Sequence, residues 1–245
     1  DGGAAHALGH LAGKQLGHGR LFQAGLTGKF DYIDRGNHFA EMVPCGCSKA
    51  TGMEKMMQLL GADRSHVFAV GDSAGANILG LYAARCADPA AANIPVTPPP
   101  GFVPTALALN CGQYCISRGQ KGLIAHLLPD ILPDGGTDAE LHAMDVTAHV
   151  TGRYPPCFVM TANNDFLKEQ APLMTAALER CGVPCVYRCY GDETQKLGHV
   201  FHCNIRAEAA QNCNTEECGF FKRQYSRCAF LSGWRCGVYS ISWFV

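Results

Sequence analysis

The stretch that decides the fold is Val67–Gly75, which reads VFAVGDSAG. Four apolar residues lead into a Gly-x-Ser-x-Gly motif, and small residues suited to a helix follow it. This order of strand, sharp turn and helix is the context that a nucleophile elbow requires. Gly71 and Gly75 leave room where a Cβ atom would clash with the neighbouring strand or helix. The stretch predicts an exposed Ser73 hydroxyl at the tip of a strained turn, with an ordinary structural turn as the alternative.

The residue after the serine offers a further polar group. Ala74 would open the helix, so its backbone N–H points out from the positive end of the helix dipole. An N–H in that place can bind the oxyanion that forms when a hydroxyl attacks a carbonyl carbon. We therefore expect Ser73 to act as a nucleophile and Ala74 to contribute to an oxyanion hole.

The composition is that of an ordinary globular protein. The 245 residues carry a formal net charge of −1, and 47% of them are hydrophobic. This length is enough for a sizeable core, and no basic stripe favours a nucleic-acid partner. The first residues show neither the basic nor the apolar segment of a signal peptide. We therefore expect a cytoplasmic protein that acts without nucleic acid or membrane.

The chain contains 14 cysteines at scattered spacings. A chain of this length does not need disulfides to fold, and no export signal is visible. We therefore expect most of these cysteines to be reduced and to serve as small core residues.

The residue composition and the hydrophobic pattern change twice along the chain. Residues 1–50 are rich in Gly, Ala and His, and their longest β-like run, Phe30–Ile33, is short and interrupted. Residues 51–222 read as regular α/β sequence, whereas residues 223–245 mix Arg, Cys, Ser and aromatic residues without a period. We predict a core of residues 51–222 between an atypical N-terminal segment, disordered or frame-shifted, and an atypical C-terminal tail.

Strand-like and helix-like runs alternate through the predicted core. The predicted strands are His66–Val70, Thr105–Asn110, Cys157–Thr161 and Cys185–Tyr190. The predicted helices are Met53–Leu60, Ala74–Arg85, Glu169–Cys181 and His202–Asn212, with loops and a short helix over 112–155. Strands separated by helices form a parallel sheet with helices on both faces. The sequence therefore predicts an α/β fold with a mostly parallel sheet.

A serine hydroxyl is a weak nucleophile, so it needs a base and a group that orients that base. Asp165 lies just past the strand Cys157–Thr161, at the end where parallel sheets keep their sites. His199 follows a glycine in the long loop after the next strand, from which an imidazole can reach over the sheet. Alternatively, Asp165 caps a helix and His199 is a surface residue. The rivals for the two roles are Asp192, Glu193 and His202.

Soft metal ligands also gather near the end of the predicted core. They are His199, His202, Cys203, Cys213 and Cys218. Zinc binds such groups, but their spacing matches no standard zinc finger, and a zinc-bound imidazole could not also act as a general base. We therefore expect no metal and no cofactor, and interpret these cysteines as core and surface residues.

Three short motifs together resemble the hormone-sensitive-lipase-like branch of the α/β-hydrolases, which includes many bacterial carboxylesterases and acetyl-esterases. They are Gly71–Gly75 (GDSAG), Asp165–Leu167 (DFL) and Gly198–His202 (GHVFH). The resemblance covers residues 51–222 and implies an α/β-hydrolase fold. It also implies that Ser73 is the nucleophile, Asp165 the orienting acid and His199 the general base and acid, in the chain order that this fold uses.

One part of that family's pattern is missing from this sequence. The family carries a His-Gly-Gly-Gly loop after an early strand, whose N–H groups form most of the oxyanion hole, and no such run occurs here. Gly2-Gly3 and Gly17-His18-Gly19 are poor substitutes because no apolar strand precedes them. We therefore expect a fold that lacks the family's N-terminal strands.

The three motifs that carry Ser73, Asp165 and His199 predict a serine esterase that hydrolyses short acyl or acetyl esters through an acyl-enzyme. The expected partner is a small-molecule ester, and the sequence does not indicate an oligomeric state. One alternative is a catalytically impaired relative that keeps the fold and lacks the oxyanion hole. A weaker alternative is a serine peptidase.

Overall fold

The computed structural model describes residues 25, 28–36, 39–61, 68–90, 96–98, 103–119, 123–132, 134–232 and 242–243. The chain divides into two compact units, residues 1–62 and residues 63–245, and each has a sheet of its own. The glycines discussed as substitutes for the missing loop, Gly2-Gly3 and Gly17-His18-Gly19, lie outside the described residues.

The first unit contains an antiparallel hairpin and a helix. Strands β1 (Phe30–Gly36) and β2 (Phe39–Pro44) pair along their length, and helix α2 (Lys49–Leu60) follows them. The sequence indicated only the short β-like run Phe30–Ile33 in this segment, whereas the structure forms two strands there. Two strands joined by a short connection stabilise each other by local pairing, so neither needs the long apolar run that marks a buried strand.

The second unit is built on a parallel sheet with the strand order β6-β5-β4-β3-β7. The strands are β3 (Phe68–Asp72), β4 (Ala106–Asn110), β5 (Cys157–Ala162), β6 (Cys185–Tyr190) and the short β7 (Ser242–Trp243). The α-helices are α3 (Ala74–Ala87), α4 (Leu123–Ile131), α5 (Asp138–Met144), α6 (Gln170–Arg180) and α7 (Glu208–Ser232), and the 3-10 helices are η1 (Val146–Ala148) and η2 (Phe201–Cys203). The predicted α/β fold is confirmed.

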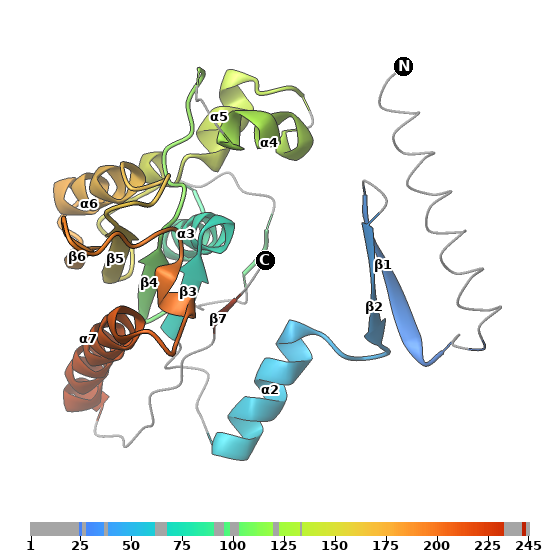
Figure 1. Cartoon of the computed structure of the whole chain (residues 1–245). Coiled ribbons are helices and arrows are strands. Elements are labelled where there is room, and N and C mark those ends of the chain that lie inside the picture. Colours follow the sequence, from blue (N-terminus) through green and yellow to red (C-terminus); the bar gives the residue numbers. More distant parts are fainter. Residues whose placement is uncertain are drawn as a thin grey trace. The chain divides into compact units, whose positions relative to one another are not determined.

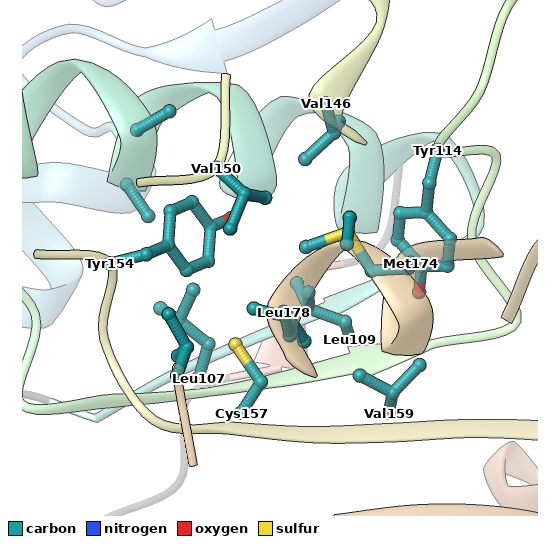
Figure 2. Close-up of a cluster of buried hydrophobic side chains, with 14 of the residues drawn as sticks. Leu107, Leu109, Tyr114, Val146, Val150, Tyr154, Cys157, Val159, Met174 and Leu178 are labelled. Carbon is teal, nitrogen blue, oxygen red and sulfur yellow. The ribbon is translucent and has the colours of Figure 1, made fainter. Parts of the chain in front are cut away.

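One face of this sheet is covered by α3 and α6. Leu107 and Leu109 of β4 and Val159 of β5 point to this face, because alternate residues of a strand share a face. They pack with Met174 and Leu178 of α6, as Figure 2 shows. All five side chains are fully buried, and each contributes about 1.5–3 kcal/mol by leaving water.

The opposite face is covered by α7, which lies across the sheet from α3 and α6 (Figure 1). Ala106 and Ala108 of β4 and Phe158 of β5 point to this side and pack against Phe220 and Phe221 of the helix. The ring centroids of Phe158 and Phe220 lie 5.9 Å apart. Helices on both faces leave the carboxyl ends of the strands as the edge where loops can gather into a site.

The C-terminal part of the core differs from the prediction. The helix predicted over His202–Asn212 is present only from Glu208, so its predicted start is wrong, and His202 lies in the 3-10 helix η2. Helix α7 then continues to Ser232, into the segment predicted as an atypical tail. Its buried residues follow helical spacing, but they include the charged Glu217 beside Ala210, Cys213, Phe220 and Phe221, so the apolar pattern in the sequence is interrupted.

None of the helices in the described ranges is both long and apolar enough for a membrane span. Among the described cysteines, Cys111, Cys157 and Cys213 are buried, and the others are partly or fully exposed. The expectation that most cysteines are core residues is therefore wrong for this part of the chain. A thiol is small enough to be tolerated on helix and strand surfaces as well as in the core.

Candidate active site

Ser73 occupies a sharp turn between β3 and α3. Its backbone has φ 55° and ψ −120°, a strained combination for a residue with a Cβ atom. Its N–H donates a hydrogen bond of 2.9 Å to the Asn110 carbonyl at the end of β4. The turn requires glycine at position 71, because a Cβ atom on Gly71 would lie 2.5 Å from the Gly75 carbonyl oxygen. The local sequence thus holds the serine hydroxyl at the edge of the sheet.

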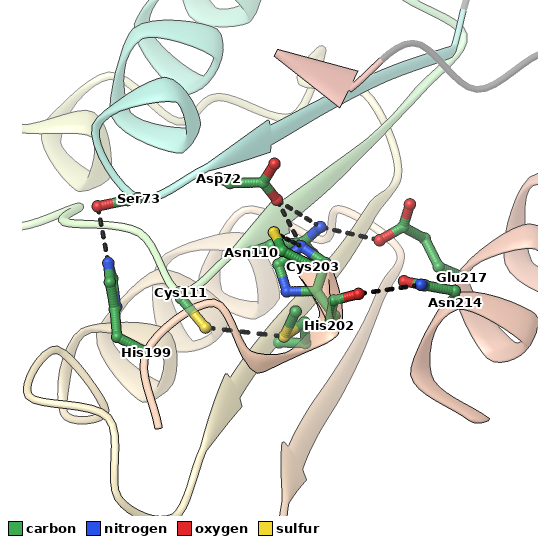
Figure 3. A network of polar contacts seen from close by, with 10 residues as sticks. Asp72, Ser73, Asn110, Cys111, His199, His202, Cys203, Asn214 and Glu217 are labelled. Carbon is green, nitrogen blue, oxygen red and sulfur yellow. Dashed lines mark hydrogen bonds and ion pairs between the residues drawn. The ribbon is translucent and has the colours of Figure 1, made fainter. Parts of the chain in front are cut away.

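The structure brings Ser73, Asp165 and His199 together in one chain of hydrogen bonds. His199 Nε2 lies 2.9 Å from Ser73 Oγ, and His199 Nδ1 lies 2.8 Å from Asp165 Oδ1. Figure 3 shows the imidazole directed at the serine hydroxyl. When Nδ1 carries the proton and donates to the carboxylate, the lone pair of Nε2 is free to accept the serine proton. This arrangement is able to activate a hydroxyl for attack on a carbonyl carbon.

The carboxyl group of Asp165 is completely buried. Burial raises its pKa, but hydrogen bonds from His199 and from the Leu167 N–H outweigh this effect and hold the pKa below its usual value. Thr161 Oγ1 donates a further hydrogen bond of 3.1 Å to Oδ2. Asp165 is thus ionised at neutral pH and can stabilise an imidazolium. Its Oδ1 also accepts the Leu167 N–H within a turn, whereas helix α6 begins only at Gln170 with Glu169 at its N-cap, so the alternative that Asp165 caps the following helix is wrong.

The loop that carries His199 is held in place by Asn163, a residue that the sequence did not single out. Asn163 Nδ2 donates hydrogen bonds to the carbonyls of Asp192 (2.7 Å) and Gln195 (3.2 Å). Its Oδ1 accepts a hydrogen bond of 2.9 Å from the Leu197 N–H. The side chain therefore joins the loop after β5 to the loop after β6. Asparagine is common in turns, so its position in the sequence is only a weak signal of this role.

Within the described residues, all three non-glycine residues with positive φ lie beside this site. They are Ser73 (φ 55°), Cys111 (φ 49°) and Val200 (φ 47°). Cys111 follows β4, and its thiol comes within 4.8 Å of the ligand atoms of Asp165 and His199. Val200 follows His199 directly. Strain of this kind persists where the surrounding structure fixes the backbone, and it clusters at functional sites.

An exposed aromatic ring flanks the imidazole. Phe166 is 56% exposed, and its ring centroid lies 4.5 Å from that of His199. The neighbouring residue Asp165 holds the other side of the same imidazole. Phe166 thus forms an apolar wall next to the base, where a substrate side chain can make contact.

The rival residues lie elsewhere. Asp192 and Glu193 are exposed, and the Asp192 carboxylate accepts hydrogen bonds from its own loop. His202 is buried, and its Nε2 lies 2.7 Å from Asp72 Oδ1. In the described structure, none of these three side chains hydrogen-bonds to Ser73. The hydrogen-bonded pair of His202 and Asp72 was not predicted from the sequence.

Ala74 is the first residue of α3 and is exposed. Its N–H lies at the positive end of this helix, directly after Ser73. The position suits a donor to an oxyanion formed at the serine.

The soft ligands considered for zinc do not converge. In the described ranges, ligand atoms approach one another in the groups Asp72, His202, Cys203 and Cys111, Asp165, His199. Neither group contains Cys213 or Cys218, and Cys213 of α7 is packed among the apolar residues between this helix and the sheet. The zinc site considered as an alternative is therefore not formed by these residues.

A family model described as alpha/beta hydrolase fold matches residues 37–203, more than half of the chain. The chain belongs to the α/β-hydrolase family. The resemblance to the hormone-sensitive-lipase-like branch is confirmed, but the match begins before residue 51 and ends before residue 222. It includes strand β2 and ends within η2. No curated protein sequence matches this hydrolase.

Solved structures of microbial esterases share the fold of this α/β-hydrolase. Esterase B from Lactobacillus rhamnosis is similar over 75% of this chain and 62% of its own, with a TM-score of 0.63 and 19% identity. An esterase from Pyrobaculum calidifontis is similar over 72% and 58%, with a TM-score of 0.52 and 17% identity. A carboxylesterase from Lactobacillus plantarum is similar over 71% and 64%, with a TM-score of 0.51 and 13% identity. This hydrolase spans less than two thirds of each of those chains.

Proposed function

We propose that this α/β-hydrolase hydrolyses carboxylic esters, with Ser73 as the nucleophile, His199 as the general base and acid, and Asp165 as the orienting acid. The observation that carries the proposal is the continuous chain of hydrogen bonds from Ser73 Oγ through the imidazole to the buried carboxylate. The strained backbone of the serine and the lowered pKa of the carboxyl are what such a reaction requires.

The reaction takes place in two stages. His199 Nε2 removes the Ser73 proton while Oγ attacks the ester carbonyl carbon, and the Asp165 carboxylate stabilises the resulting imidazolium. The imidazolium then protonates the leaving alcohol, so that the acyl group stays on the serine. In the second stage the same imidazole takes a proton from water, and the hydroxyl attacks the acyl carbon. The bond from that carbon to Ser73 Oγ then breaks, the imidazolium returns the proton to Oγ, and the carboxylic acid leaves. No cofactor takes part.

The tetrahedral oxyanion of each stage needs hydrogen-bond donors. The Ala74 N–H at the start of α3 is the donor that the geometry supports. The sequence contains no His-Gly-Gly-Gly run to supply the others. Losing one donor typically lowers kcat by about 10²–10³. This observation favours slow turnover, and it makes a catalytically impaired relative the second candidate function.

The substrates that we propose are small esters with short acyl or acetyl groups. The apolar wall formed by Phe166 beside His199 offers contact to a hydrocarbon group but no charged partner. The many free thiols of the described residues suit a reducing compartment, so we propose the cytoplasm as the location.

Hydrolysis of p-nitrophenyl acetate and butyrate by wild-type chain and by Ser73→Ala tests the proposal. We expect the variant to fall to the background rate with an unchanged circular dichroism spectrum, because the half-buried Ser73 side chain lies at the edge of the sheet and not in the apolar core. Ser117→Ala, at an exposed serine, is the control and should keep the wild-type rate. Equal turnover by Ser73→Ala and the wild type would remove Ser73 from the mechanism.

A further inference from the structure

A second pair of histidine and aspartate lies behind the serine. His202 Nε2 and Asp72 Oδ1 are 2.7 Å apart, and both side chains are buried (Figure 3). Asp72 is the last residue of β3 and directly precedes Ser73. His202 lies three positions after His199, in η2. The loop after β6 therefore contacts the nucleophile strand twice, through His199 at the serine and through His202 at the residue before it.

Asn110 links this pair to the serine backbone. Its carbonyl accepts the hydrogen bond of the Ser73 N–H at 2.9 Å. Its side-chain Nδ2 donates to Asp72 Oδ1 at 3.1 Å and to Glu217 Oε2 at 2.9 Å. One buried asparagine at the end of β4 thus contacts the turn, the aspartate and helix α7 at the same time.

Helix α7 contacts the same cluster of Asp72, Asn110 and His202 through two of its side chains. Its Glu217 is buried against Asn110, and its Asn214 Nδ2 donates a hydrogen bond of 3.1 Å to the His202 carbonyl. Figure 3 shows these two side chains approaching the cluster from the helix. Both the histidine loop and the nucleophile strand are therefore tied to one rigid element that packs on the sheet.

The cluster is built from hydrogen bonds rather than as a metal site. Two ligands of one tetrahedral zinc ion stand about 3.3 Å apart, since each metal bond is about 2.0–2.2 Å long. His202 Nε2 and Asp72 Oδ1 are closer than this, at the distance of a direct charge-assisted hydrogen bond. The side chains therefore hold one another without an ion between them.

We propose that His202 is a positioning residue. By donating to Asp72 it fixes the loop after β6 against β3, which keeps His199 Nε2 within hydrogen-bonding distance of Ser73 Oγ. Only two residues separate His199 from His202, and Val200 between them has a positive φ, a strained conformation that persists where surrounding contacts fix the backbone. The role in turnover rests on the proposed function, whereas the positioning of His199 does not.

The test compares His202→Gln with His202→Asn. Both variants place an amide in the buried site, but only the longer glutamine can set its N–H where the imidazole Nε2 lies and reach Asp72. We expect His202→Gln to keep kcat within about threefold of the wild type. His202→Asn should lose about 10²-fold in kcat with an almost unchanged KM, since a misplacement of about 1 Å has that effect.

A second measurement follows the position of His199 without any substrate. The proton on His199 Nδ1 that is shared with Asp165 should give a low-field ¹H resonance in the wild type, absent in His199→Ala. We expect this resonance in His202→Gln and its loss or broadening in His202→Asn. If His202→Asn does not fold, Asn214→Ala removes the bond to the His202 carbonyl and should weaken the same resonance.

The two proposals fail in different ways. A wild-type chain that neither hydrolyses esters nor reacts with a fluorophosphonate contradicts the proposed function, while the resonance still tests the positioning role. A His202→Asn variant that folds and keeps both the resonance and the wild-type kcat overturns the positioning role. A loss of thermal stability alone, with kcat and the resonance unchanged, does the same.

Discussion

Asp165 is the residue whose replacement separates orientation from proton transfer. In Asp165→Asn the shape of the side chain remains, but the amide cannot stabilise an imidazolium and favours the wrong tautomer of His199. By analogy with other triads we expect kcat to fall about 10⁴-fold. Asp192→Asn is the matched control, since the Asp192 side chain is exposed and accepts hydrogen bonds from Thr194 and Gln195 of its own loop. A near-normal kcat in Asp165→Asn would give the acid role to Asp192 or Glu193.

The lowered pKa of Asp165 also predicts how acid affects the fold. Because the pKa is lower in the folded chain than in the unfolded chain, where it is about 3.9, the ionised carboxyl stabilises the folded state. This stabilisation is complete above the unfolded pKa and is lost as the pH falls through the folded pKa. Urea denaturation should show that the difference in unfolding free energy between wild type and Asp165→Asn shrinks below about pH 4. A difference that stays constant down to the folded pKa contradicts this expectation.

The sequence predicts single residues well where their signal is local. Ser73 is marked by its two flanking glycines and by the strand before it, all within a few positions. The pair of His202 and Asp72 carries no such signal, because the two residues lie 130 positions apart. The sequence also does not distinguish a buried polar side chain from an exposed one. Only the folded chain reveals that His202 is a buried partner rather than a rival base.

At the scale of loops, Asn163 joins the two segments that carry the acid and the base. Asn163→Ala removes three side-chain hydrogen bonds and leaves two carbonyls and one N–H of the histidine loop without this partner. We expect a loss of about 1–3 kcal/mol in unfolding free energy, together with a lower kcat. Denaturation curves and ester hydrolysis measure the two effects.

Its neighbour provides a matched control. Asn164 is exposed and contributes its backbone N–H to the Leu197 carbonyl, a contact that Asn164→Ala keeps. This variant should therefore resemble the wild type in both stability and kcat. Equal losses in Asn163→Ala and Asn164→Ala would show that the side-chain bonds of Asn163 do not hold the loop.

Secondary-structure elements were predictable where their periodicity is strong. The strands β3, β4 and β5 are short runs of mostly buried residues between turn signals, and β6 is a half-exposed run of β-forming residues. The predicted positions of all four lie within a few residues of those observed. The hairpin of β1 and β2 and the full length of α7 were missed. The hairpin has no long apolar run, and the buried stripe of α7 includes the charged Glu217, so neither element shows a clear apolar pattern in the sequence.

At the scale of the whole molecule, the number of N–H donors in the oxyanion hole sets the expected rate of ester hydrolysis. Replacing residues 1–50 by a family-like segment with a His-Gly-Gly-Gly loop should raise kcat/KM on an acetyl ester by about 10²-fold or more, because each added N–H donor stabilises the oxyanion. Circular dichroism would confirm that both chains fold. If the original chain already turns over like an ordinary esterase, its first fifty residues supply donors that the sequence does not reveal.

The most direct measurement is the reaction of the purified chain with a fluorophosphonate probe, followed by mapping of the labelled residue by mass spectrometry. A fluorophosphonate reacts only with a serine that a base has activated, so it reports on the hydrogen-bond chain of Ser73, His199 and Asp165 as a unit. We predict a single label on Ser73, no label in Ser73→Ala, and much slower labelling in His199→Ala. An unlabelled chain, or a label on any other residue, would contradict the assignment of this site.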